Sequence, residues 1–196
     1  MRDPVSFEDL DDLEEALRSA SPAEHASAAA DLASWAESPH PQDIPFPGDL
    51  LIAAGDLLSR AADLSGALAH YQRAAELGTS EGPDANAYVV DTLFQLDRPQ
   101  EARTLSETLR RARPERVDTY LAMATVWELN GDLRQSLGWS TRGIALAEEV
   151  DGPPADLGLL CVARWRVRQE QGMEPDEYDE LAMGFLDAVD EGAGEA

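Results

Sequence analysis

Apolar residues recur at helical spacing through most of the chain, and the clearest stretch runs from Asp49 to Gly78. Its two apolar series are Leu51, Ala54, Gly55 and Leu58, then Leu64, Ala67, Tyr71 and Ala74. Spacings of three and four residues place each series on one helix face. Small residues in both series let two antiparallel backbones approach closely, while Leu58 and Tyr71 fill the space beside them. The stretch therefore predicts a helical hairpin.

The same pattern returns further along the chain. Ala67, Ala102 and Ser136 are equivalent positions, 35 and 34 residues apart. The first helices of the later two repeats carry Val89, Val90 and Leu93, then Tyr120, Met123, Ala124 and Trp127, and Pro114 closes the second repeat. Because each hairpin leaves one apolar face that only a neighbouring hairpin can cover, the recurrence indicates a stack of hairpins.

The spacing resembles the tetratricopeptide repeat family, which has small residues at its eighth, twentieth and twenty-seventh positions and a period of about 34 residues. The resemblance covers Asp49 to Glu148, about half of the chain. It implies an all-α fold, a right-handed superhelical array of antiparallel helix hairpins, or α-solenoid. Asn86 stands where the family favours tryptophan, and Ser106 and Ser140 replace Tyr71, so the later repeats must pack differently. A generic array of helical hairpins is the alternative.

Residues 1–37 predict an atypical hairpin that caps the array. Its first helix has an apolar stripe of Phe7, Leu10, Leu13 and Leu17. Ser6 with Asp9 and Ser21 with Glu24 have the spacing of capping boxes at two helix starts. Residues 38–48 hold four prolines and predict a loop, in which Ile44 and Phe46 either form an exposed docking site or tuck against the hairpins. We expect the second arrangement.

Residues 49–149 hold the three repeats, and residues 150–190 predict a degenerate hairpin and a capping helix. In the first helix of this last part, Leu157, Cys161 and Trp165 share one stripe. The final helix begins near Pro175 and has a fully apolar face, made of Tyr178, Leu181, Ala182, Phe185, Leu186 and Val189. The polar residues 191–196 predict a disordered tail.

Composition restricts the classes of partner and location. The net charge is −24, all 15 cations are arginine, and there is one cysteine. The acidity disfavours nucleic acid as a partner, and the lone cysteine suits a reducing compartment. No apolar run approaches a membrane span, and the acidic N-terminus is unlike a signal peptide, so we expect a cytoplasmic protein with no membrane partner. GC-rich coding, a saline cytoplasm or a basic partner would each explain the acidity.

The sequence contains no motif for catalysis, cofactor binding or metal binding. His25, His40 and His70 are isolated from each other and from Cys161. There is no phosphate-binding glycine loop and no serine in a nucleophile elbow. Cys161 lies mid-stripe, which favours a core position over a nucleophile. We therefore expect no enzymatic activity and no cofactor.

In the tetratricopeptide family, positions two, five, nine and twelve of each repeat face a groove that holds a peptide. By that resemblance, the candidate partner-binding residues here are Asp49, Ile52, Asp56, Asp84, Asp91, Phe94, Leu121 and Glu128. Position five is apolar in all three repeats, so the family's clamp for a C-terminal carboxylate is not supported. Carboxylates beside apolar residues instead predict a groove for a basic, partly apolar segment of a protein or peptide. Asp49 and Asp84 stand at helix starts, where capping is the alternative role.

A cationic segment interrupts the acidic chain. Arg98 to Ala145 contains eight arginines and six acids, and Arg110, Arg111, Arg113 and Arg116 cluster near a helix end. This cluster is either a solvated patch paired with nearby acids or a contact for an acidic partner surface. The leading hypothesis is a non-catalytic interaction adaptor. The alternative is a module that associates with itself, such as a homodimer, through the Arg98 to Arg116 patch.

Overall fold

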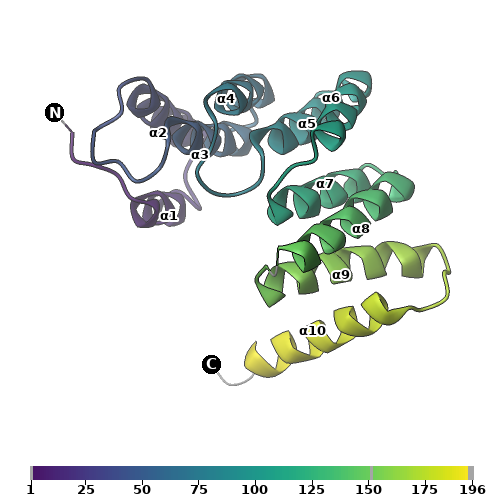
Figure 1. The fold of residues 1–196 in the computed structure, drawn as a ribbon. Helices are drawn as coiled ribbons and strands as arrows, with labels where there is room; N and C mark the ends of the chain where they lie inside the picture. The colour runs from purple at the N-terminus through teal and green to yellow at the C-terminus, as the bar shows by residue number, and fades with distance from the viewer. Residues whose placement is uncertain (1, 151, 194–196) are drawn as a thin grey trace. The chain divides into compact units, whose positions relative to one another are not determined.

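The structure, a computed structural model, describes residues 2–150 and 152–193, which form ten α-helices and no β-strand. This confirms the all-α prediction (Figure 1). The helices are α1 (Phe7–Ala16), α2 (Pro22–Glu37), α3 (Pro47–Arg60), α4 (Leu64–Leu77), α5 (Ala85–Gln95), α6 (Pro99–Ala112), α7 (Val117–Leu129), α8 (Leu133–Glu149), α9 (Pro154–Glu170) and α10 (Glu177–Ala193). None of the described helices is long and apolar enough to cross a membrane.

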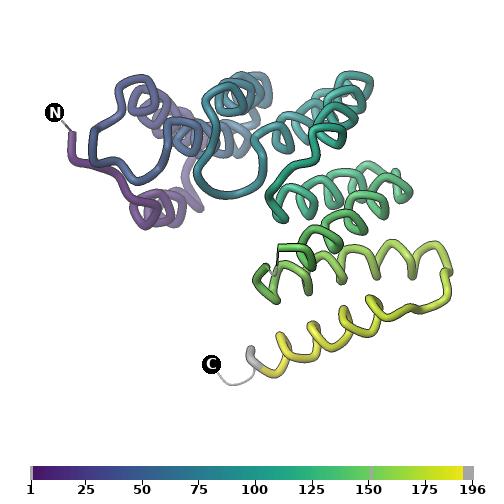
Figure 2. The backbone as a smooth tube through the Cα atoms, viewed as in Figure 1, coloured from purple at the N-terminus to yellow at the C-terminus, as the bar shows by residue number. Residues whose placement is uncertain are grey.

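The chain divides into two compact units, and each packs its helices in sequence order. The first unit ends at Leu109, and in it α2 packs on α3, α3 on α4 and α4 on α5. The second unit begins at Arg110, and in it α7 packs on α8, α8 on α9 and α9 on α10. Figure 2 traces the backbone through these successive helices. In the second unit α7 also contacts α9, so one helix touches the next but one.

The turns after α3, α5 and α7 share one geometry. In each, an amide donates to the carbonyl five residues earlier: Asp63 to Leu58 at 2.9 Å, Arg98 to Leu93 at 2.9 Å and Asp132 to Trp127 at 3.0 Å. The residue before each amide has a positive φ: Ala62, Asp97 and Gly131. This is the Schellman arrangement, which satisfies the last carbonyls of a helix. The turns are spaced 35 and 34 residues apart, the same period as the predicted repeat.

The predicted small positions occupy matching places in their helices. Ala67, Ala102 and Ser136 are each the fourth residue of α4, α6 and α8, and all three are fully buried. Leu58 and Tyr71 are buried too, as their core assignment requires. The helix register predicted from the sequence is therefore confirmed at these positions.

Glycines mark the closest helix contacts. A methyl group added at Gly55 would lie 2.7 Å from Cδ1 of Tyr71, closer than real side chains approach. In the second unit, Gly158 lies as closely under the ring of Phe185, and a methyl group added at Gly143 would meet Leu160 at 2.7 Å. The ring of Tyr71 thus packs directly on the α3 backbone, which fixes the position of its hydroxyl.

A group of paired ions joins α9 to Asp176, just before α10, and to Asp179 in its first turn. Arg164 donates two hydrogen bonds to Asp176, at 2.9 and 2.6 Å, and Arg168 donates to Asp179 at 3.1 Å. The Arg164 guanidinium lowers the pKa of Asp176 to about 2. Both arginines are buried, because the two carboxylates neutralise them. Cys161 is fully buried, which raises its thiol pKa to about 11, and it is a core residue as predicted.

Three sequence predictions fail in detail. Ile44 and Phe46 are 62% and 55% exposed, so the loop does not tuck them against the helices. In α10, Leu181 and Val189 are 50% and 51% exposed, because only part of the predicted apolar face packs on α9. The helix continues to Ala193, into the predicted disordered tail, whose last residues, 194–196, lie outside the described residues.

The contact between Gly55 and Tyr71 gives a direct test of the packing. We expect Gly55→Ala to lower the free energy of unfolding by about 1–3 kcal/mol through overpacking, although alanine favours helix by about 1 kcal/mol. Gly184→Ala in α10 is the matched control, because the space around Gly184 is open and the alanine should stabilise. Denaturant unfolding measures both, and a stabilised Gly55→Ala variant would contradict the packing.

Candidate functional site: an acidic pocket between α1 and α3

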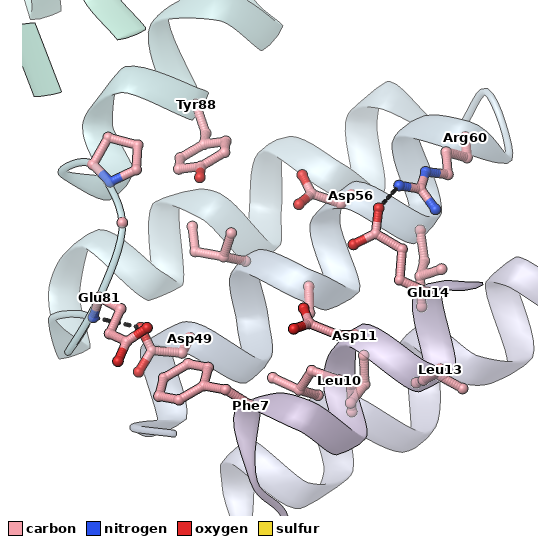
Figure 3. A pocket seen from close by; sticks show the side chains of 16 residues that line it. Phe7, Leu10, Asp11, Leu13, Glu14, Asp49, Asp56, Arg60, Glu81 and Tyr88 are labelled. Carbon is pink, nitrogen blue, oxygen red and sulfur yellow. Dashed lines mark hydrogen bonds and ion pairs between the residues drawn. The ribbon is translucent and has the colours of Figure 1, made fainter. Parts of the chain in front are cut away.

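The first unit contains a pocket of about 290 Å³ between α1, α3 and the start of α5, shown in Figure 3. Its apolar lining includes Phe7, Leu10, Leu13, Ile52, Leu57 and Tyr88. Its charged lining consists of Asp11, Glu14, Asp49, Asp56, Glu81 and Arg60. Five carboxylates thus share the pocket with one guanidinium. We call this site the acidic pocket.

The N-terminal segment fixes where α1 begins. Asp43 accepts hydrogen bonds from the Val5 amide at 2.9 Å and the Arg2 guanidinium at 2.8 Å, and the Ile44 amide donates to the Val5 carbonyl at 3.0 Å. The hydrogen bond from Arg2 holds the pKa of Asp43 well below its usual range. The predicted capping box of Ser6 and Asp9 then starts the helix. These hydrogen bonds fix the segment before α1 and so place the start of α1 near α3.

The packing of α1 itself is shallow. No residue of α1, all of which the structure describes, is buried, and its apolar stripe is only half-buried. Glu14 forms an ion pair with Arg60 of α3, visible in Figure 3. After the helix, Nε2 of His25 lies 2.9 Å from the Leu17 carbonyl. The helix is thus held by partly exposed contacts on one side.

Asp49 and Asp84 have structural partners. The Asp49 carboxylate accepts from the amides of Phe46 at 2.7 Å and Ser80 at 3.0 Å, so it caps α3 and holds the segment before α5. Asp84 caps α5 by accepting from the Asn86 amide at 2.8 Å. The capping alternative is therefore confirmed for both. Asp49 still contributes to the wall of the acidic pocket.

Asp56 is the carboxylate whose environment is most unusual. It lies mid-helix on α3, half-buried, and accepts a hydrogen bond of 2.6 Å from the Tyr71 hydroxyl. Burial raises its pKa to about 6, the charge of Glu14 adds to the rise, and the hydrogen bond from Tyr71 opposes it. A cation placed beside Asp56 would lower that pKa.

Asp91 lies close to the same tyrosine. The rings of Tyr71 and Tyr88 stack with centroids 5.3 Å apart. Burial raises the pKa of Tyr71, and the charges of Asp56 and Asp91 add to the rise. Burial raises the pKa of Asp91, which accepts a hydrogen bond of 2.7 Å from Gln95. Asp56 and Asp91 therefore both act on Tyr71, but only Asp56 lines the acidic pocket.

The remaining predicted residues are not brought into the acidic pocket, apart from Ile52, which lines it. Phe94 is half-buried on α5, in the first unit. Leu121 and Glu128 belong to α7 in the second unit, where Glu128 accepts from Arg166 at 2.9 Å.

The predicted arginine patch is largely engaged within the chain. Arg110 and Arg111 each have a partner, and Arg116 pairs with Asp118 at 3.5 Å. For Arg116, the pair with Asp118 matches the alternative of a patch paired with nearby acids.

The sequence analysis missed the contribution of α1. The stripe of Phe7, Leu10 and Leu13 was identified, but helical periodicity shows which face is apolar without showing what that face covers. Asp11 and Arg60 were missed for the same reason. Tyr88 was missed because it falls outside the four groove positions of the repeat pattern. The capping box of Ser6 and Asp9 gave the local signal for where α1 would start.

No family model, curated protein or solved structure matches this chain. Within the described residues, no group of three or more histidine, cysteine or carboxylate side chains is arranged to hold a metal ion. The geometry of the site itself offers apolar walls and a negative field.

The raised pKa of Asp56 predicts that Asp56→Asn stabilises the protein, by an amount that depends on pH. The pKa of Asp56 is about 6 in the folded protein, above the usual 3.8 of an unfolded chain. The contribution of Asp56 to stability is therefore fully present below about pH 4 and is lost as the pH rises through 6. The variant cannot ionise, so its advantage over the wild type should grow by at most about 3 kcal/mol from pH 4 to pH 7. Urea unfolding across this range measures it.

Asp31→Asn, which removes an exposed carboxylate from α2, controls for the change in net charge. A stability difference between Asp56→Asn and the wild type that does not change with pH would show that folding does not raise the pKa of Asp56.

Proposed function

We propose that this protein is a non-catalytic protein–protein interaction module that binds a basic, partly apolar segment of a partner at the acidic pocket. The observation that carries the proposal is the pocket itself, in which apolar side chains are surrounded by five carboxylates and one guanidinium. An amphipathic segment with lysine or arginine at its edges matches both properties. Its apolar side chains would bury against Ile52 and Leu57, and its cations would lie beside Asp56 and Glu81.

We further propose that the scaffold is a tetratricopeptide-like solenoid, a right-handed array of antiparallel hairpins. Three repeated Schellman turns and three buried small residues at the same period support this. The start of α3 also approaches the end of α4, since a methyl group at Gly48 would lie 2.7 Å from the Gly78 carbonyl carbon. That contact supports an antiparallel arrangement of α3 and α4. In such an array, the first helices of the hairpins form a surface suited to binding an extended or helical segment.

Electrostatics would act mainly on the rate and selectivity of binding. An exposed ion pair contributes only about 0.2–1 kcal/mol, and salt screens it. Several carboxylates of one sign would speed the encounter with a basic segment and disfavour acidic ones. The cytoplasm suits this activity, since the single cysteine, Cys161, is a buried free thiol.

The proposal predicts salt-dependent binding of a basic amphipathic peptide. The probe is a fluorescently labelled peptide of leucine and lysine, and anisotropy gives its Kd at low and high salt. We expect Asp56→Asn with Glu81→Gln to raise Kd about three- to tenfold at low salt and to flatten the salt dependence, because two rim carboxylates are lost.

Asp31→Asn with Glu37→Gln is the matched control, because it removes the same charge from exposed positions on α2 outside the pocket. Equal effects of the two double variants would mean that only net charge attracts the peptide. The pocket would then have no role in binding.

A further inference from the structure

One wall of the acidic pocket is the protein's own α1, which lies along the α3 face. Phe7, Leu10 and Leu13 turn toward α3 and line the pocket, while Glu14 reaches Arg60 (Figure 3). The apolar positions are three residues apart, one per helical turn, as in helices that dock in a groove. The arrangement shows that the α3 face accepts an amphipathic helix in this position.

The charges of α1 are poorly matched to the acidic pocket beside the α3 face. The helix carries six carboxylates and no cation in its ten residues. Asp11 faces the pocket, where Asp56, Asp49 and Glu81 are already gathered, and Glu14 adds to the rise in the pKa of Asp56. Like charges in one pocket repel, and Arg60 is the single cation in its lining. A helix with a cation in place of Asp11 would remove that repulsion and keep the apolar contacts.

The attachment of α1 is shallow, which favours its release without unfolding of the rest of the unit. None of its residues is buried, whereas α2, α3, α4 and α5 pack on one another through buried side chains. The segment before α1 remains held by Asp43, and α2 begins with its own capping box at Ser21. Elements with few buried contacts open at low free-energy cost. Because α1 is tethered, it also competes with any partner at high effective concentration.

We infer that α1 is a displaceable occupant of the α3 face, and that the partner replacing it is an amphipathic helix with a cation where α1 carries Asp11. This inference rests on the proposed function and specifies its ligand. The partner helix has apolar residues at the positions of Phe7, Leu10 and Leu13. An acid at the position of Glu14 would retain the ion pair with Arg60. While α1 is seated, it lowers the affinity of the site for that partner.

The full-length variants Asp11→Lys and Asp12→Lys test this inference. Both change the net charge equally, and both replace exposed, neighbouring residues of α1, but only Asp11 lines the pocket. Asp11→Lys should hold α1 more firmly, because it replaces one of the five carboxylates of the pocket with a cation. We expect amide hydrogen exchange in residues 7–16 to slow about two- to fivefold relative to Asp12→Lys. The Leu–Lys peptide should bind Asp11→Lys more weakly than Asp12→Lys by a similar factor.

The two readouts separate this inference from the proposed function. Equal exchange in α1 of the two variants would overturn the inference, even if the peptide binds. Tighter peptide binding by Asp11→Lys than by Asp12→Lys would overturn it as well, since the peptide would then not share the seat of α1. If hydrogen exchange in α1 slows as expected but the peptide binds no variant, the α3 face does favour a helix with a cation at position 11, and the proposed function fails.

Discussion

The close packing of aromatic rings on glycines of the neighbouring helix is the constraint on which the rest of the structure depends. At Gly55 the ring of Tyr71 packs directly on α3, which places the tyrosine hydroxyl within hydrogen-bonding distance of Asp56. Gly158 with Phe185 repeats this device in the second unit. A larger residue at either glycine would push the helices apart. The position and chemistry of the acidic pocket therefore follow from how tightly α3 and α4 pack.

Tight packing also explains why the pocket has an electrostatic imbalance. Asp56 is held half-buried by the Tyr71 contact, where its charged form is disfavoured, and its nearest charged neighbours include another acid, Glu14. The buried carboxylate of the second unit, Asp179, has cationic partners in Arg164 and Arg168. The acidic pocket lacks this compensation apart from Arg60, which is paired with α1. An uncompensated negative site with apolar walls is suited to a cationic amphipathic ligand, and α1 covers it in the isolated chain.

Local features were predictable from the sequence, because helix periodicity, capping and turn chemistry act over a few residues. The equivalence of Ala67, Ala102 and Ser136 and the capping boxes of α1 and α2 are examples. Long-range partners were not predictable. The stripe on α1 does not encode that it faces α3, and the charge of Arg164 suggests solvent until Asp176 is placed beside it. Ile44 and Phe46 show the opposite case, apolar residues that the loop geometry leaves exposed.

The account can be tested most directly at the Asp56 carboxyl group. Carbon NMR of the wild-type protein gives the pKa of Asp56 alone and with a saturating Leu–Lys peptide. Without peptide, the account predicts a value raised to about 6. With peptide, it predicts a fall toward or below the usual value, because the ligand's cation replaces the acids of α1 beside Asp56. A pKa that is normal in the free protein, or that saturating peptide leaves unchanged, would contradict it.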